Sequence, residues 1–169
     1  MNTRKQRQIF DEWLNNHRGI LFKIIRAYAF NPNDQDDLFQ EISLQLWKSI
    51  PDFRGDSKPS TWMYRVALYT ATVWVRKEKK RPLTQPLTEV ERTLTVTNHP
   101  RDERSEWLYE QISQLEPIDR SVCLLLLDGF SYKEMAEMLG ISESNIGVKV
   151  HRIKRHLIQE SKDMEYHGL

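Results

Sequence analysis

Carboxylates crowd into one short stretch of the sequence, and carboxylates are the groups with which many nucleases hold catalytic metal ions. Asp34, Asp36, Asp37 and Glu41 make up this group. Two-metal hydrolysis needs carboxylates that converge on one pocket. On a helix, however, Asp37 and Glu41 share one exposed face. Asp34 and Asp36 fall at the helix start, where a negative charge interacts favourably with the positive end of the helix dipole. This spacing favours a charged surface over a metal centre.

Histidine and cysteine add no metal-binding pattern. The five histidines are scattered, and none stands at ligand spacing from a cysteine or a carboxylate. The single cysteine, Cys123, lies in the apolar run 122–127 and is expected in the core. One cysteine excludes a disulfide within the chain. We therefore expect no metal, no cofactor and no enzyme activity.

A second kind of chemistry, the binding of nucleic acid, is indicated by residues 131–157. Ser131 and Glu134 have the spacing of a capping box, which begins a short helix. Gly140 ends that helix where a left-handed residue is needed. Ser142 then caps a second helix. The segment therefore predicts two helices joined by a tight, glycine-containing turn.

The second of these helices has one apolar and one polar face. Ile146, Val150, Ile153 and Leu157 recur at helical spacing and predict a buried stripe. The other side and its flanks carry Ser144, Asn145, Val148, Lys149, His151, Arg152 and Arg155. This arrangement is typical of a helix-turn-helix, in which the start of the second helix reaches base edges and cations neutralise phosphates. The alternative is an ordinary pair of helices with a solvated basic face.

Composition sets the scale of the fold. A chain of 169 residues with 39% hydrophobic content suits two small helical units better than one large core. The net charge of +1 does not by itself indicate nucleic-acid binding. Any such binding must therefore depend on local basic patches. The first residues contain no apolar signal segment, and no stretch reaches the length of a membrane span. We expect a cytoplasmic protein without membrane insertion.

The N-terminal part predicts two helices, over residues 4–29 and 35–50. Gly19 weakens the middle of the first and is where a break is expected, and Asp34 is the expected cap of the second. In the second helix the apolar arc comprises Leu38, Phe39, Ile42, Leu46 and Ile50. Leu44 lies on the opposite side among acidic residues, which suits a protein-binding surface. The alternative is a solvated face with one stray leucine.

A loop over residues 51–59 leads to a helix that combines aromatic side chains with cations. Ser60 is its expected cap, and its end carries a basic block between Arg76 and Arg81. It holds more apolar and aromatic residues than one buried stripe needs, so some aromatics are expected at the surface. Surface aromatics beside cations provide stacking faces for unpaired bases and charge for the backbone. The alternative is a core helix with a solubilising basic end.

Helical periodicity is lost over residues 82–104, which are rich in proline and threonine and predict a linker. Helices are expected again over residues 105–115 and 118–127. The chain is therefore predicted to be all-α, with two small helical domains, 1–81 and 105–169, joined by a flexible linker. The C-terminal domain would contain the helix-turn-helix.

Two blocks of the sequence now resemble one family. The first block, which resembles domain 2 of bacterial sigma factors, reads DQDDLFQEISLQLWKSIPDFRGDSKPSTWMYRVALYTA. The second, which resembles their domain 4, reads LEPIDRSVCLLLLDGFSYKEMAEMLGISESNIGVKVHRIKR. With only a short linker between the blocks, the layout is similar to that of the extracytoplasmic-function group.

The resemblance implies a role for each surface, without catalysis. Docking on core RNA polymerase, at the β′ clamp helices, would involve Asp36, Asp37, Gln40, Glu41 and Leu44. Binding of the −10 promoter element would involve Phe53, Arg54, Trp62, Tyr64, Arg65, Tyr69, Arg76 and Lys77, with Tyr64 in a pocket for an unstacked base. Binding of the −35 element would involve Ser144, Asn145, Gly147, Val148, Lys149, His151, Arg152 and Arg155. Contact with the polymerase β flap and control by an anti-sigma factor are further expectations from the resemblance.

Gly147 is unusual within a recognition helix, because glycine there costs about 1 kcal/mol relative to alanine. Close approach to the DNA backbone is a plausible reason for it. A free-standing helix-turn-helix regulator is the alternative function. This hypothesis explains residues 131–157 but assigns no function to the acidic surface or to the aromatic, basic helix. It predicts specific DNA binding without polymerase.

Overall fold

The computed structural model describes residues 2–79 and 102–166, and the side chains as far as residue 163. Within these ranges the regular structure is entirely helical, as the sequence predicted. The chain divides into two compact units, Met1–Asp102 and Glu103–Leu169. Most of the predicted linker lies outside the described residues, but its last two positions, Glu103 and Arg104, already belong to a helix.

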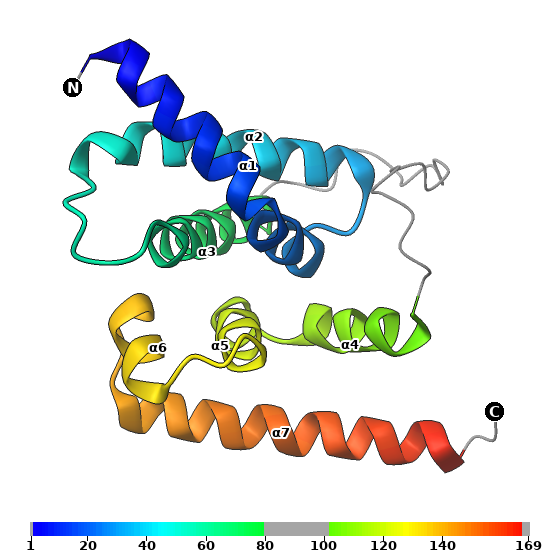
Figure 1. Cartoon of the computed structure of the whole chain (residues 1–169). Helices are drawn as coiled ribbons and strands as arrows, with labels where there is room; N and C mark the ends of the chain where they lie inside the picture. Colours follow the sequence, from blue (N-terminus) through cyan, green and yellow to red (C-terminus); the bar gives the residue numbers. More distant parts are fainter. Residues whose placement is uncertain (1, 80–101, 167–169) are drawn as a thin grey trace. The chain divides into compact units, whose positions relative to one another are not determined.

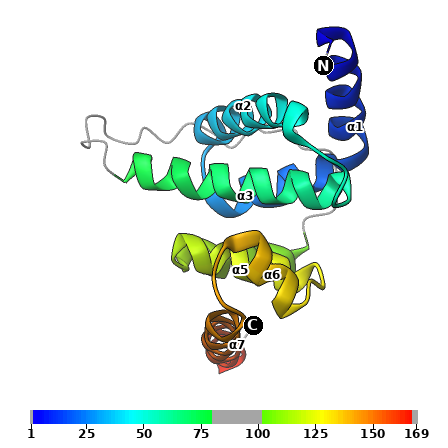
Figure 2. The ribbon, with the colours of Figure 1, turned by 90° about the vertical axis from the view of Figure 1, so that its left-hand side faces the viewer.

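Over residues 2–79 the N-terminal unit consists of three helices and one short 3-10 turn. They are α1 (Thr3–Tyr28), α2 (Pro32–Ser49), η1 (Ile50–Asp52) and α3 (Pro59–Glu78). Each of the three helices packs against the other two (Figures 1 and 2). The fully buried side chains include Leu21, Ile24, Leu38, Ile42, Leu46, Ile50, Met63 and Leu68. The apolar stripes of three amphipathic helices thus close on one core.

The starts of α2 and α3 differ from the prediction. Asn31 caps α2, because its side-chain oxygen accepts a hydrogen bond of 2.9 Å from the Asp34 backbone N–H. Asp34 therefore lies inside the first turn instead of capping it. Helix α3 begins at Pro59, one residue before the expected cap Ser60. Proline suits the first helical position, since its φ is preset and its missing N–H would have no partner there.

Helix α1 contains a break, but not at the predicted position. The backbone of His17 leaves helical geometry, with φ −128° and ψ 23°. The break therefore falls two residues before Gly19. The chain continues as a helix on both sides of it, so that Trp13 and Leu21 are both buried in the N-terminal unit.

The C-terminal unit consists of α4 (Glu103–Gln114), α5 (Pro117–Leu127), α6 (Tyr132–Leu139) and α7 (Glu143–Tyr166). Helices α5 and α6 pack against α7, and α4 packs against α5 (Figure 1). The core includes Ile112, Val122, Leu125, Met135, Ile146, Val150 and Ile153. The predicted stripe of α7 is thus buried over three of its four positions, while Leu157 is only half-buried.

The helix-turn-helix forms through the predicted local interactions. The Ser131 hydroxyl accepts from the Glu134 backbone N–H, and the Glu134 carboxylate accepts from the Ser131 backbone N–H at 2.7 Å. Gly140 adopts the left-handed conformation, with φ +68°, and ends α6. The Ser142 hydroxyl accepts from the Asn145 backbone N–H, which begins α7. These three devices confirm the predicted pair of capped helices.

Candidate polymerase-binding and nucleic-acid-binding surfaces

One face of α2 is charged and open to solvent, and we call it the acidic surface. Its exposed members are Asp36, Asp37, Gln40 and Leu44. Leu44 has 46% of its surface exposed, as the helical wheel predicted for the one apolar residue on this side. Glu41 is half-buried at the edge, where its carboxylate accepts a hydrogen bond of 3.0 Å from Gln45. The surface offers carboxylates beside one exposed apolar side chain, which complements a basic partner.

Asp37 has a second relationship, to α3. Its Oδ2 accepts a hydrogen bond of 2.8 Å from the indole Nε1–H of Trp74. Trp74 is buried, so α3 anchors one carboxylate of the acidic surface. No local pattern predicts this pairing, because the two residues are 37 positions apart.

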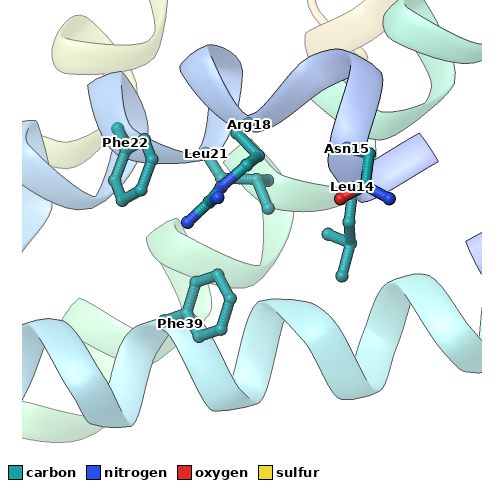
Figure 3. Close-up of a pocket in the computed structure, with 6 residues that line it drawn as sticks. All are labelled: Leu14, Asn15, Arg18, Leu21, Phe22 and Phe39. Carbon is teal, nitrogen blue, oxygen red and sulfur yellow. The ribbon is translucent and has the colours of Figure 1, made fainter. Parts of the chain in front are cut away.

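A hollow of about 210 Å³ lies between α1 and α2 (Figure 3). It is lined by Leu14, Asn15, Arg18, Leu21, Phe22 and Phe39. The Arg18 guanidinium lies 5.5 Å from the centre of the Phe22 ring, within the range of a cation–π contact. Phe39 is 39% exposed, which corrects its predicted place in the core. Phe39 is on the same helix as the acidic surface, so this hollow borders that surface.

The loop between η1 and α3 is held by an aromatic cluster. The Phe53 ring packs edge-on against Trp13 of α1 and against Trp62 of α3. The distances between ring centres are 4.9 Å and 5.6 Å. The Trp62 Nε1–H donates a hydrogen bond of 3.1 Å to the Ser49 hydroxyl. Both Phe53 and Trp62 are half-buried, because part of each side chain packs within this cluster. Trp13 was not predicted to take part in a site.

Beyond Phe53 the loop turns outward. Arg54 and Gly55 are exposed, and Gly55 has a φ of +82°, which disfavours any residue with a side chain. The anchored start and the glycine turn together present Arg54 to solvent. This placement leaves the Arg54 cation open to a phosphate.

The outward face of α3 carries aromatic and cationic groups together. Tyr69 is 73% exposed, and Arg65, Arg76 and Lys77 are exposed as well. Arg65, Tyr69 and Arg76 recur at helical spacing and share one face. Tyr64 differs from the prediction, because it is only 2% exposed and packs in the core of the N-terminal unit. It is therefore closed to a base, and Tyr69 is the open aromatic ring of this helix.

The outward face of α7 comprises most of the predicted −35 residues. Ser144, Asn145, Val148, His151, Arg152 and Arg155 are all exposed. Gly147 is half-buried beside α6, where an added Cβ would meet Tyr132 Cε2 at 3.7 Å. Lys149 departs from the prediction, because its Nζ pairs with Asp119 Oδ1 of α5 at 2.7 Å. The cation predicted to neutralise a phosphate already has a carboxylate partner.

Within the ranges 2–79 and 102–166, no group of three or more His, Cys, Asp or Glu could hold a metal ion. None of the helices that the structure describes is long and apolar enough to cross a membrane.

Comparison with known proteins agrees with this arrangement. The Sigma-70 region 2 family model matches residues 13–81, and the Sigma-70 region 4 model matches residues 105–157. The RNA polymerase sigma factor YlaC of Bacillus subtilis is 31% identical over 127 residues, which cover 72% of this chain and 73% of that protein. The ECF RNA polymerase sigma-E factor of Haemophilus influenzae is 27% identical over 135 residues, covering 72% and 71%.

Two solved structures have a similar fold. One is CnrH in complex with the cytosolic domain of CnrY, with a TM-score of 0.63, 18% identity and coverage of 93% of this chain and 90% of that one. The other is the sigma factor RpoE in complex with the anti-sigma factor NepR from Bartonella quintana, with a TM-score of 0.63, 16% identity and coverage of 92% and 96%.

An all-helical chain with these two matched regions is a transcription initiation factor of the sigma class. It belongs to the extracytoplasmic-function (ECF) group of RNA polymerase sigma factors. Membership implies RNA polymerase and promoter DNA as its partners.

Proposed function

We propose that this sigma factor directs core RNA polymerase to promoters by reading a −10 and a −35 element, and that it promotes melting without catalysis of its own. One observation carries the proposal. The chain presents an acidic surface with an exposed leucine, an aromatic and cationic face on α3, and an open helix-turn-helix face on α7. Each surface suits a different partner, and a free-standing regulator would need only the third.

The N-terminal domain, residues 1–81, would bind polymerase through the acidic surface. Leu44 would provide the apolar contact, and Asp36, Asp37, Gln40 and Glu41 would face cations of the β′ clamp helices. The hollow beside Phe39 lies next to this surface and extends the area that polymerase could cover. The β flap would meet the C-terminal domain, residues 105–169.

The −10 element would bind along α3 and the loop before it. Tyr69 would offer a ring on which an unpaired base can stack, and Arg65, Arg76 and Lys77 would neutralise the strand backbone. Arg54 would add a cation at the loop, which Phe53 and Trp62 hold in place. Capture of unpaired bases favours the melted state, because those bases are accessible only after strand separation. Tyr64 would support this face from the core.

The −35 element would bind in duplex form against α7. Ser144, Asn145 and Val148 lie in its first two turns, where a recognition helix reaches base edges. His151, Arg152 and Arg155 follow on the same exposed side and would contact the backbone or neighbouring bases. The capped turn between α6 and α7 fixes the angle at which this helix enters the groove.

An anti-sigma factor is the expected regulator. The structural neighbour RpoE was solved in complex with the anti-sigma factor NepR. By analogy, a partner of this kind would cover the surfaces that polymerase or DNA needs, which would hold the factor inactive until a signal releases it.

The test is transcription in vitro with sigma-free core polymerase, the full chain and fragmented genomic DNA of the host. Sequenced transcript starts should be discrete and should share two upstream motifs. A parallel reaction with another sigma factor shows that the core enzyme is active. Absence of starts in an active system would overturn the proposal in favour of a free-standing regulator, which should then bind specific DNA without polymerase.

A further inference from the structure

We propose that Asp119 limits the electrostatic affinity of α7 for DNA, because its carboxylate masks the Lys149 cation and removes it from the DNA-facing charge of that helix. The inference rests on the proposed −35 role of that helix. It assigns a function to a residue of α5 that lies outside the proposed DNA-binding surface. It also gives Lys149 a positioning role in place of a phosphate contact.

The geometry supports a lasting pair. Lys149 Nζ lies 2.7 Å from Asp119 Oδ1, and the two side chains are only 13% and 17% exposed. Pairs that are largely withdrawn from water are screened less by salt than surface pairs. The bond joins residues 30 positions apart and connects α5 to α7, two helices that also pack through their apolar faces. Lys149 therefore points from the recognition helix toward its own scaffold.

The electrostatic consequence concerns DNA of any sequence. The logarithm of the binding constant falls linearly with the logarithm of the salt concentration. Each phosphate that a protein cation neutralises makes this log–log slope steeper by about 0.9. Such contacts increase affinity for all duplexes and carry no base information. A lysine paired with a carboxylate contributes little to this attraction. Masking Lys149 thus weakens the sequence-independent attraction of α7 to every duplex and reduces its salt dependence, while the exposed Arg152 still contributes to both.

The experiment measures binding of the full-length chain to a random-sequence duplex at several salt concentrations. Asp119→Asn has nearly the same shape and removes only the charge, so it should release the lysine. Its log–log slope should steepen by about 0.9, which is an additional affinity loss of about 3.5-fold between 50 and 200 mM salt. Lys149→Gln should leave the wild-type slope unchanged, and the double variant should return to it. Loss of structure alone would not steepen the slope.

Arg152→Gln is the control for the proposed function, and its slope should become shallower by about 0.9. If Lys149→Gln has the same effect and Asp119→Asn none, Lys149 contacts phosphate and the masking is wrong while the −35 role stands. If no variant of α7, Arg152→Gln included, changes the slope, the −35 role itself fails. Absence of any duplex binding by Asp119→Asn at low salt would also overturn the inference.

A second readout compares two duplexes in the complete holoenzyme. The log–log slope should steepen by about 0.9 for Asp119→Asn on a promoter duplex and on a random duplex alike, because a phosphate contact carries no base information. Circular dichroism should show an unchanged helical content. A steeper slope on only one of the two duplexes would contradict a phosphate contact by the released lysine.

Discussion

Trp74 of α3 donates its indole N–H to the Asp37 carboxylate of α2, across 2.8 Å. Asp37 belongs to the acidic surface, whose proposed partner is polymerase, while Trp74 lies on the buried side of α3, whose outward side has DNA as its proposed partner. A buried donor thus fixes the position of a carboxylate at the edge of the acidic surface. Loss of this bond should affect both the stability of the N-terminal unit and the orientation of Asp37.

Trp74→Phe should destabilise the N-terminal unit by about 1 kcal/mol, because it retains most of the ring but leaves the carboxylate without this donor. Asp37→Ala should remove the same bond from the other side. In a double-mutant cycle followed by urea unfolding, the two effects should therefore be non-additive. Additive effects would show that the bond contributes nothing measurable.

Leu44→Lys should weaken binding to core polymerase by about tenfold or more, because an apolar side chain at the centre of an interface is replaced by a charge. Since Leu44 is exposed, the free energy of unfolding should change by less than about 0.5 kcal/mol. Ile158→Lys, at an exposed apolar position of α7, is the matched control. Equal polymerase affinities for the two variants would argue against the acidic surface as the docking site.

Tyr69→Ala should lower the affinity of the holoenzyme for single-stranded −10 DNA by about 1 to 3 kcal/mol, the range for one stacked base. Tyr69→Phe should bind nearly normally, because it retains the ring. Tyr132→Ala removes another exposed tyrosine, on α6, and should leave single-strand binding unchanged. A similar loss in both alanine variants would point to a general effect on the fold.

Gly147→Ala should stabilise α7 by about 0.5 to 1 kcal/mol, because alanine is the better helix former and its methyl group fits at 3.7 Å from Tyr132. If Gly147 faces the duplex, the same change should reduce −35 affinity. Amide hydrogen exchange in α7 measures the first effect, and a gel-shift titration with a −35 duplex measures the second. Reduced protection of α7 would mean that the Tyr132 ring does not accept the methyl group.

The Cys123 thiol should make the chain less stable at high pH. Its side chain is 1% exposed, and burial raises its pKa from 9.0 to about 11. The unfolded chain therefore loses this proton before the folded chain does, so stability is full below pH 9 and falls as pH approaches 11. The loss should reach at most about 2.5 kcal/mol. Cys123→Ala should lack this component when urea midpoints are compared across the same pH range.

Local patterns predicted most of the fold. The helices, the capping box at Ser131 and the left-handed Gly140 depend on neighbouring residues, so one sequence is enough to find them. The predicted starts of α2 and α3 were wrong by three and two residues, because several residues near Pro32 and Pro59 could serve as caps. Periodicity places a residue on a face but does not show how far a neighbouring helix covers that face. For this reason Phe39 was assigned to the core although it is partly open.

The sites were harder to predict, because they depend on contacts between distant residues. The exposure of Leu44 and of the arginines on α7 followed from the helical wheel. Burial of Tyr64 depends on how α3 packs against α1 and α2, and this helix has two tyrosines and two tryptophans from which to choose. The pairing of Lys149 with Asp119 joins two helices, and the contact of Trp13 with Phe53 joins α1 to the loop after η1. No spacing rule within one segment reveals such contacts.

The division into two units also separates the tryptophans, since four of the five, Trp13, Trp47, Trp62 and Trp74, precede Asp102, and only Trp107 follows it. Intrinsic fluorescence is therefore a natural reporter for the N-terminal unit. A Trp107→Phe chain would emit from that unit alone, and a chain that keeps only Trp107 would emit from the other. Spectra of these two chains can show, without any attached dye, which half of the factor responds first when polymerase, promoter or an inhibitor is added.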